Sequence, residues 1–214
     1  MRGAVSSQEL RDWIGERLDP LDDREPADAV HSDFDLSQTW RPADPSAPLT
    51  HAAVLVPLVE REQGITVLLT RRSDTLRNHT GQIALPGGRR DPGESLWQTA
   101  LREAEEEIGL DRGFVDLVGL SSPYRTGSNY LVTPVVGFVR PGFTLTPNPG
   151  EVADIFETPF GFLMDPDNYE QHEWPSPQGV RRFYATTHED RYIWGATAGM
   201  LRGLYERLYG GAVA

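Results

Sequence analysis

The pattern of apolar positions divides the chain into an arm, a domain and a short tail. Residues 7–18 place apolar side chains at helical spacing, which predicts a short amphipathic helix. Residues 19–50 are rich in Asp, Pro and Ser and lack periodicity, so we expect an extended arm there. Beyond it, strand-like apolar runs follow one another. We therefore predict an arm over 1–50, a domain over 51–209 and a tail over 210–214.

The domain begins with strands, continues with a helix and further strands, and ends with a helix. The segment EREQG between the first two apolar runs is a hairpin signal. The predicted strands are 52–59, 65–71, 114–122, 131–139 and 152–159, with weaker candidates at 181–187 and 192–196. A terminal helix is predicted over 197–208. This order indicates an α+β or α/β sandwich rather than an array of βαβ units.

The helix in the middle of the domain carries start and stop signals of its own. Ser95 with Gln98 three residues later is a capping-box pattern, and Gly109 sits where a C′ glycine belongs. Its apolar residues share one face, suited to packing on a sheet, and they are Trp97, Ala100, Leu101, Ala104 and Ile108.

Glutamates gather at the C-terminal end of this helix, where the helix macrodipole is already negative. Glu103, Glu106 and Glu107 share one stripe because they are three and four residues apart. Glu105 points elsewhere, and we expect it to be solvated. An oxygen-only cluster suits a hard divalent cation such as Mg²⁺ or Mn²⁺, which would offset the repulsion between the carboxylates. A solvated acidic face is the alternative.

The segment before the helix favours the metal site over the solvated face. LPGGRRDPGE, residues 85–94, is a glycine-rich turn whose backbone can approach a metal or a phosphate closely. Arg102 can pair with Glu94 and so tie this turn to the helix.

The turn and the helix together resemble a family signature. Gly88, five residues, Glu94, seven residues and then REAEEEIGL match the Nudix box at every fixed position, with Ala104 and Leu110 at its two aliphatic positions. So many fixed positions make this pattern far more specific than a short glycine motif. The chain is thus similar to Nudix hydrolases, which cleave a diphosphate linked to another moiety with Mg²⁺ or Mn²⁺ and water. The resemblance implies a Nudix fold, an α/β/α sandwich with a mixed β-sheet between helices, here with an N-terminal helical arm and a C-terminal helix.

The resemblance also implies a role for each residue of the box. Glu103 and Glu107 ligate the metal together with the Gly87 carbonyl, and Glu106 ligates a metal or positions the attacking water. Glu94 and Arg102 form a structural ion pair that holds the loop on the helix. The residues taken as catalytic are Glu103, Glu106 and Arg102, and those taken as structural support are Glu94, Gly88 and Gly109.

The general base is left open, because clustered glutamates titrate as a coupled set. Nudix enzymes also recruit a base from a loop outside the box. The candidates are Glu103, Glu106, Glu151 and Glu157, of which Glu151 can instead serve to fix its loop.

A basic cluster precedes the glycine turn, and arginine is suited to a bidentate grip on phosphate oxygens. Its members are Arg71, Arg72, Arg77 and His79, for which ordinary surface arginines and a loop histidine are the alternative. The stretch LLTRRSDTLRNHTGQIALPGG, residues 68–88, resembles the additional signature of the coenzyme A diphosphatase branch, as do LVTPVVGFV, NPGEVADIFETPFGFLMDP and IWGATAGML farther on. This implies cleavage of coenzyme A to 3′,5′-ADP and 4′-phosphopantetheine, with the basic cluster binding the substrate. Leu85 stands where relatives often carry phenylalanine, and residues 1–50 have no counterpart.

Other functions are compatible with the box, because it supplies metal and water but not specificity. A Nudix hydrolase of ADP-ribose or NADH is the first alternative, and a non-catalytic Nudix-fold binding protein is the second. An isopentenyl-diphosphate isomerase is disfavoured because that chemistry uses a cysteine, and this chain has none. A calcium-binding module is disfavoured because the carboxylates lie on a helix rather than in an acidic loop.

Composition limits the partners. Lys+Arg 20 and Asp+Glu 32 give the 214-residue chain a net charge of −12, which disfavours nonspecific binding to nucleic acid or to an anionic membrane. The sequence lacks a signal-peptide pattern and any run of about 20 apolar residues, so we expect a cytoplasmic protein that acts on a small molecule. The resemblance also allows a homodimer, with the arm as an interface element.

Overall fold

Two long parallel strands form the centre of the structure, a computed structural model that describes residues 7–22, 26, 28–37, 39–42, 44, 46–74, 81–176 and 179–210. Strand β2 (Thr50–Arg61) runs beside β8 (Tyr130–Val139) in parallel. Alternate residues of β2 face opposite sides of the sheet, so that Val54 and Val56 belong to one buried cluster and Leu55 to another. The central strand is therefore buried on both faces.

The described residues form a nine-stranded mixed sheet around this pair, in the order β1-β7-β8-β2-β3-β4. In addition β5 pairs with β2, β6 with β8 and β9 with β3. The remaining strands of the sheet are β1 (His31–Ser32), β3 (Gly64–Arg72), β4 (Ile83–Ala84), β5 (Gly87–Arg89), β6 (Val115–Leu120), β7 (Tyr124–Arg125) and β9 (Val152–Pro159). Parallel pairs occur at β2–β8 and β1–β7, and the other pairs are antiparallel.

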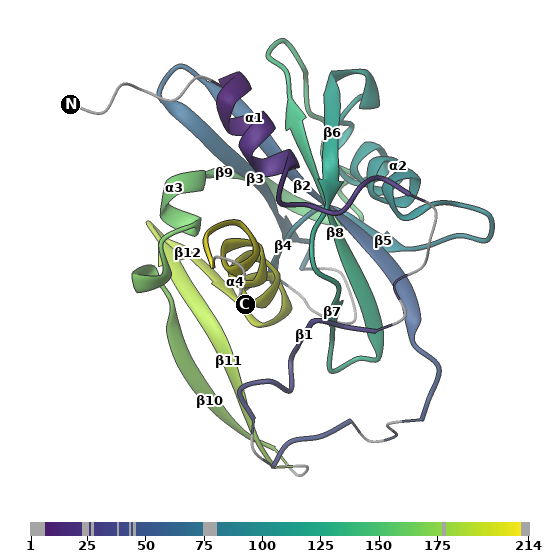
Figure 1. Ribbon diagram of the computed structural model, residues 1–214, viewed down its shortest axis with the longest axis vertical. Helices are drawn as coiled ribbons and strands as arrows, with labels where there is room; N and C mark the ends of the chain where they lie inside the picture. The colour runs from purple at the N-terminus through teal and green to yellow at the C-terminus, as the bar shows by residue number, and fades with distance from the viewer. Residues whose placement is uncertain are drawn as a thin grey trace.

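Helices cover both faces of this sheet (Figure 1). Helix α2 (Leu96–Ile108) packs in one buried cluster. Helices α1 (Ser7–Gly15), α3 (Phe160–Leu163) and α4 (Gly195–Tyr209) contribute to the other. The predicted sandwich of a mixed sheet between helices is confirmed.

A second, three-stranded sheet lies beside α4 and contains β10 (Glu170–Ser176), β11 (Gly179–His188) and β12 (Arg191–Trp194). Short 3₁₀ turns occur at Arg112–Phe114 and Pro166–Asn168. Strand β10 was not predicted, because it is polar and largely exposed and so has no apolar alternation. The prediction that 192–196 is a strand is wrong at its end. Gly195 adopts a φ of 63°, which breaks the strand and starts α4.

The described part of the arm packs on the domain. Strand β1 pairs in parallel with β7, and Asp19 bridges to Leu120. Helix α4 packs closely against β1 and β7 because Gly199 and Gly203 have no Cβ. A Cβ on Gly203 would lie 2.9 Å from the His31 ring. The arm therefore forms part of the molecule's surface beside α4 rather than an isolated extension.

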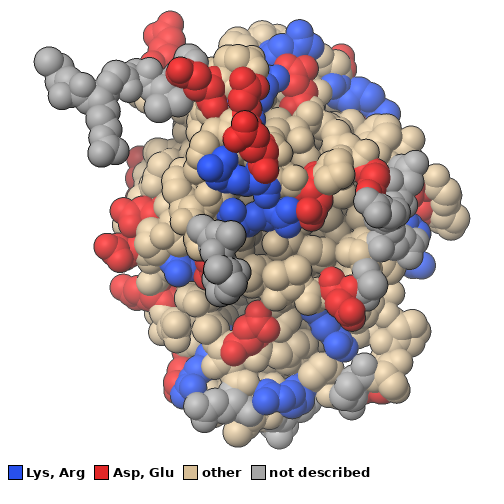
Figure 2. Space-filling model, in the orientation of Figure 1, with Lys and Arg blue, Asp and Glu red and all other residues tan. Residues whose placement is uncertain are grey.

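Acidic and arginine side chains are interspersed on the face of the molecule shown in Figure 2. All 20 basic residues of the chain are arginines. Among the described residues, no helix is long and apolar enough to cross a membrane.

Candidate active site

Helix α2 is fixed by the caps that its sequence predicts. The Ser95 hydroxyl accepts a hydrogen bond from the Gln98 backbone N–H, and the Gln98 side chain accepts one from the Ser95 N–H at 2.8 Å. At the other end Gly109 adopts the left-handed conformation with a φ of 66°. The capping box and the glycine stop are both confirmed, so the register of the glutamates on the helix is set locally.

The loop that follows β8 closes the C-terminal end of α2. The backbone N–H of Asn148 donates to the Glu107 carbonyl, and that of Thr146 donates to the Ile108 carbonyl, both at 2.8 Å. The Asn148 side chain also donates to the Glu151 carboxylate at 3.1 Å. These bonds satisfy carbonyl groups that a helix end leaves without partners, and they bring Glu151 to the glutamate stripe.

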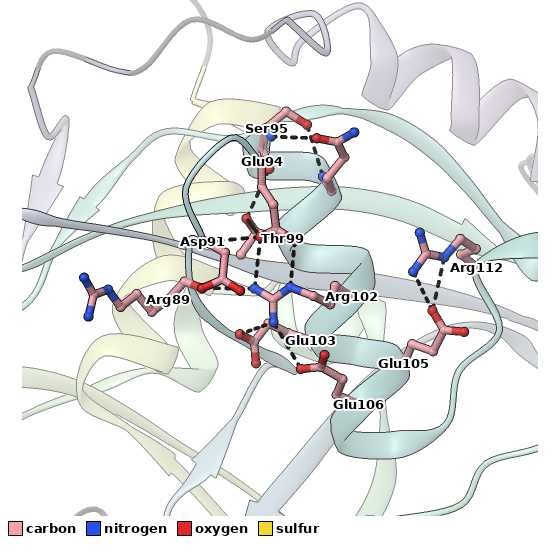
Figure 3. A network of polar contacts seen from close by, with 11 residues as sticks. Arg89, Asp91, Glu94, Ser95, Thr99, Arg102, Glu103, Glu105, Glu106 and Arg112 are labelled. Carbon is pink, nitrogen blue, oxygen red and sulfur yellow. Dashed lines mark hydrogen bonds and ion pairs between the residues drawn. The ribbon is translucent and has the colours of Figure 1, made fainter.

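Arg102 connects the glycine turn to the glutamate stripe (Figure 3). Its guanidinium binds both carboxylate oxygens of Glu94, at 2.7 and 3.0 Å. It also donates to Glu103 at 2.9 Å, to Glu106 at 3.1 Å and to the Arg89 carbonyl at 3.1 Å. These hydrogen bonds from Arg102 are the main reason that the pKa of Glu94 falls to about 2. The predicted pair of Glu94 and Arg102 is present, and the same arginine reaches two of the three stripe carboxylates.

The three stripe glutamates occupy different environments. Glu106 is the most exposed, with 57% of its side chain accessible, whereas Glu103 is 16% and Glu107 only 6% accessible. The Glu107 carboxylate accepts a hydrogen bond from the Gly87 N–H at 3.1 Å. Glu105 lies on another face, as predicted, but it pairs with Arg112 rather than being only solvated.

Burial raises the pKa of the two inner glutamates. The pKa of Glu107 rises to about 7, chiefly through loss of solvent, and that of Glu103 rises for the same reason. The negative charge of Glu151 contributes to both upward shifts. Glu103, Glu107 and Glu151 therefore lie close enough to sense one another, in a part of the protein that disfavours their charged forms.

The donor set suits a hard divalent cation, although the side chains alone do not enclose one. Within the described residues no three His, Asp or Glu side chains converge as a metal-binding group. Mg²⁺ is commonly held by one or two carboxylates, with water and substrate phosphates completing the shell. Glu103 and Glu107 supply such carboxylates, and Gly88 leaves space beside one of them: a Cβ there would lie 2.5 Å from the Glu103 carboxylate oxygens.

The two candidate bases outside the box differ in position. Glu151 lies at the glutamate stripe. Glu157 instead pairs with Arg61 and accepts a hydrogen bond from the Thr66 hydroxyl at 2.6 Å, and Arg61 lowers its pKa. Thr66 and Arg72 lie six residues apart on β3, about 20 Å for an extended strand. The partners of Glu157 therefore lie near the end of β3 that is farther from the glycine turn.

The predicted basic cluster is divided in the structure. Arg72 lies 4.0 Å from the Glu107 carboxylate, whereas Arg71 pairs with Asp74 at 3.3 Å. The pairing of β3 with β9 shifts register between these two arginines, and the two guanidiniums contact different carboxylates. Arg77 and His79 lie outside the described residues.

A pocket of about 700 Å³ opens beside the glycine turn, within the size range of small-molecule sites. Arg72, Gly87, Gly88 and Arg89 line one part of it. Its other walls contain Asp33, Trp40, Arg181 and Trp194, which sequence reasoning missed. Trp194 lies in IWGATAGML, one of the pieces that carry the resemblance, but no local pattern could have revealed the other three, which come from the arm and β11, far apart in the chain.

Comparison with known proteins identifies the family. Residues 49–186 match the family model of the NUDIX domain, and the chain therefore belongs to the Nudix hydrolases. It is 42% identical to the uncharacterized Nudix hydrolase NudL of Photorhabdus laumondii over 74% of this chain and 84% of the relative. NudL of Yersinia enterocolitica is also 42% identical, over 83% of this chain and 90% of the relative.

Among solved structures, the chain is similar to a Caenorhabditis elegans Ap4A hydrolase binary complex, with a TM-score of 0.46 and 21% identity over 51% of this chain and 80% of that one. Membership of the family makes the protein a hydrolase of a class that generally uses divalent metal cations and small-molecule nucleotide substrates.

The ion pair of Glu94 with Arg102 predicts a dependence of stability on acid. Because the pKa of Glu94 falls from 4.5 to about 2 on folding, its contribution is fully present above pH 4.5 and is lost as the pH falls toward 2. The Glu94→Gln variant should therefore be less stable at neutral pH and show a flatter loss of stability between pH 4.5 and 2. Urea unfolding at several pH values across this range measures the free energy of unfolding of each variant. Glu105→Gln, which removes an exposed pair, is the matched control, and parallel curves for wild type and Glu94→Gln would contradict the prediction.

The two glycines of the turn should respond differently to alanine. A Cβ on Gly88 meets only the movable end of Glu103, so Gly88→Ala should fold while displacing that carboxylate and reducing kcat/KM by roughly 100-fold. A Cβ on Gly87 meets the backbone of Val54 at 2.5 Å, so Gly87→Ala should lose about 1–3 kcal/mol of stability or more. Gly161→Ala, where a Cβ meets nothing within 4 Å, is the control. Thermal unfolding and steady-state kinetics separate the two effects, and equal stability losses at both positions would contradict this account.

Proposed function

We propose that this Nudix hydrolase cleaves the diphosphate of coenzyme A, or of a coenzyme A derivative, to 3′,5′-ADP and 4′-phosphopantetheine. The observation that carries the proposal is the stretch 68–88, which resembles the additional signature of the coenzyme A diphosphatase branch. Both ends of this stretch meet at one pocket, since Arg72 and the glycine turn line it together. A signature whose ends converge on one pocket beside the box glutamates supports a role in binding the substrate there.

The metal-binding residues in this proposal are Glu103, Glu107 and the Gly87 carbonyl. A bound Mg²⁺ or Mn²⁺ supplies charge neutralisation at the phosphate oxygens and a lowered pKa for water. The Gly87 N–H holds the Glu107 carboxylate in place, and Arg102 holds that of Glu103. The hydrogen bonds of these two carboxylates therefore orient them before any ligand arrives.

Proton transfer from the attacking water requires a nearby carboxylate. Glu103, Glu106 and Glu151 are the candidates close to the stripe, and Glu157 is engaged by Arg61 elsewhere. Arg102 occupies one oxygen of Glu106, which favours a positioning role for that residue. The hydrogen bond from the Asn148 amide to the Glu151 carboxylate supports Glu151 as the base in this proposal.

The alternative substrate is another nucleoside diphosphate derivative, such as ADP-ribose or NADH. The glutamate stripe, Arg72 and the pocket serve any diphosphate, so only the signature stretch distinguishes coenzyme A. The non-catalytic binding protein loses support, because the relatives are hydrolases and every carboxylate of the box is present.

Binding of the metal should raise thermal stability without any substrate. At a hundredfold excess over its dissociation constant, a cation that binds only the folded state adds about 2.7 kcal/mol. For a chain of this length, that raises Tm by roughly 5–10 °C. Glu103→Gln and Glu107→Gln should abolish the rise seen with Mg²⁺ or Mn²⁺ in differential scanning fluorimetry, whereas Glu105→Gln should keep it. An unchanged rise in both inner variants would remove these residues from the metal site.

Turnover decides the substrate. With Mg²⁺, coenzyme A should give 3′,5′-ADP, resolved by chromatography, with a higher kcat/KM than ADP-ribose or NADH. Glu107→Gln should lower kcat/KM by more than the roughly 10–100-fold that is lost when a residue supporting a metal ligand is removed, and Glu105→Gln should not. Preference for ADP-ribose or NADH would refute the coenzyme A assignment while leaving the box chemistry in place.

A further inference from the structure

The pocket beside the glycine turn has a second end, built from segments outside the Nudix box. Three segments form it: the arm with Asp33 and Trp40, the loop 126–128, and the junction of β12 with α4 around Trp194. None of these residues belongs to the signature stretch or to the glutamate stripe. They therefore supply the pocket with side chains that the metal-binding residues do not account for.

Arg181 of β11 is the centre of this second end. Its guanidinium carbon lies 5.1 Å from the Trp40 ring centroid and 6.0 Å from that of Trp194. Its Nη2 lies 3.3 Å from the Asp33 carboxylate. A planar guanidinium between two indoles, tethered by a carboxylate, is held in a fixed orientation in the pocket wall.

Asp33 is committed to holding this arrangement together. Its side chain is only 4% accessible, and its carboxylate accepts hydrogen bonds from the Tyr124 hydroxyl at 2.9 Å and the Gly127 N–H at 2.7 Å. These two donors and the ion pair with Arg181 stabilise the buried carboxylate. The arm is thereby linked to β7, to the loop after it and to β11 through one buried side chain.

The charge of the pocket selects an anionic ligand. Of the described residues that line it, Arg72, Arg89 and Arg181 are cationic and Asp33 alone is acidic. This positive excess lies in a chain whose net charge is −12. Arg72 and Arg181 lie at different walls, one beside Glu107 and the other beside Trp40. The two walls match a ligand whose diphosphate lies at Arg72 and whose further anionic or planar group lies at Arg181.

We infer that Trp40, Arg181 and Trp194 form a subsite for the nucleoside end of the substrate, a heteroaromatic base on a phosphorylated ribose. Indole rings and a guanidinium plane are the surfaces on which nucleobases stack, and arginine also pairs with phosphate. The pantetheine half has neither an aromatic ring nor a charge beyond its own phosphate. The arm, through Trp40 and Asp33, thus determines specificity. The inference rests on the proposed function only in that a nucleoside diphosphate derivative is cleaved in this pocket.

Binding of the separate halves of the substrate tests this subsite without turnover. Adenosine 3′,5′-diphosphate, AMP and 4′-phosphopantetheine are titrated into the full-length protein by calorimetry, in EDTA so that no metal contributes. Arg181→Ala and Trp194→Leu should raise the dissociation constants of both nucleotides at least tenfold and leave that of 4′-phosphopantetheine within twofold. Trp40→Phe, which keeps an aromatic ring, should give an intermediate loss, and Trp40→Leu the full one.

Matched controls come from the same elements and residue types. Arg182→Ala removes the neighbouring arginine of β11, which pairs with Glu173, and Trp174→Leu removes an exposed indole of β10. Both should bind the nucleotides as the wild type does. Circular dichroism and Tm establish whether each variant is folded. If Arg181→Ala does not fold, Arg181→Lys takes its place, because lysine keeps the positive charge but lacks the planar guanidinium.

The outcomes separate this inference from the proposed function. If nucleotide binding falls in the Arg181 and Trp194 variants, the subsite stands, even if turnover shows that ADP-ribose rather than coenzyme A is the substrate. If these variants lose 4′-phosphopantetheine instead, the pocket is oriented the other way and the inference is overturned. It is equally overturned if neither half is affected, or if the wild type binds no nucleotide at millimolar concentration.

Discussion

The hydrogen bonds of Arg102 are the interaction on which the site depends. A helix that ends in four glutamates opposes its own macrodipole, and each like-charge pair costs a few tenths of a kcal/mol. Hydrogen bonds to charged groups contribute about 1.5–3 kcal/mol each, and Arg102 makes such bonds to the partly buried Glu94 and Glu103, with a weaker one of about 0.3–0.5 kcal/mol to the exposed Glu106. The guanidinium therefore outweighs the repulsion on the outer side of the stripe. Arg102 does not reach Glu107, which is buried and whose cationic neighbour, Arg72, is 4.0 Å away. Glu107 is therefore the stripe carboxylate whose charged form a bound metal would stabilise most.

The sheet places this helix against the glycine turn. Strand β5 pairs with β2 so that Gly87 lies opposite Val54 and Gly88 opposite Ala53. Helix α2 packs on the same sheet through its buried face, which includes Ala100. The turn and the stripe are thus held at a fixed separation by a strand that is buried over most of its length. Rigid elements of this kind hold catalytic groups more accurately than loops do.

The parts of the site that are local in sequence could be predicted, and those that depend on tertiary contacts could not. The caps at Ser95 and Gly109 and the pair of Glu94 with Arg102 follow from spacing along one turn and one helix. The approach of Arg72 to Glu107 depends on the packing of β3 beside α2, which a run of basic residues in the sequence does not reveal. Trp40 and Arg181 meet only because the arm folds back over the second sheet, and no periodicity in the sequence encodes that contact.

This difference between local and distant residues also separates chemistry from specificity. Every residue assigned to the metal or to its support lies between Gly87 and Gly109, a segment that can be recognised wherever it occurs. The other walls of the pocket come from the arm, from β11 and from the start of α4, none of which belongs to the glycine turn or to the stripe. Asp33 joins the arm to Tyr124, Gly127 and Arg181 through one buried carboxylate. The box can therefore identify the reaction, while the proposed substrate specificity rests on residues that lie outside it.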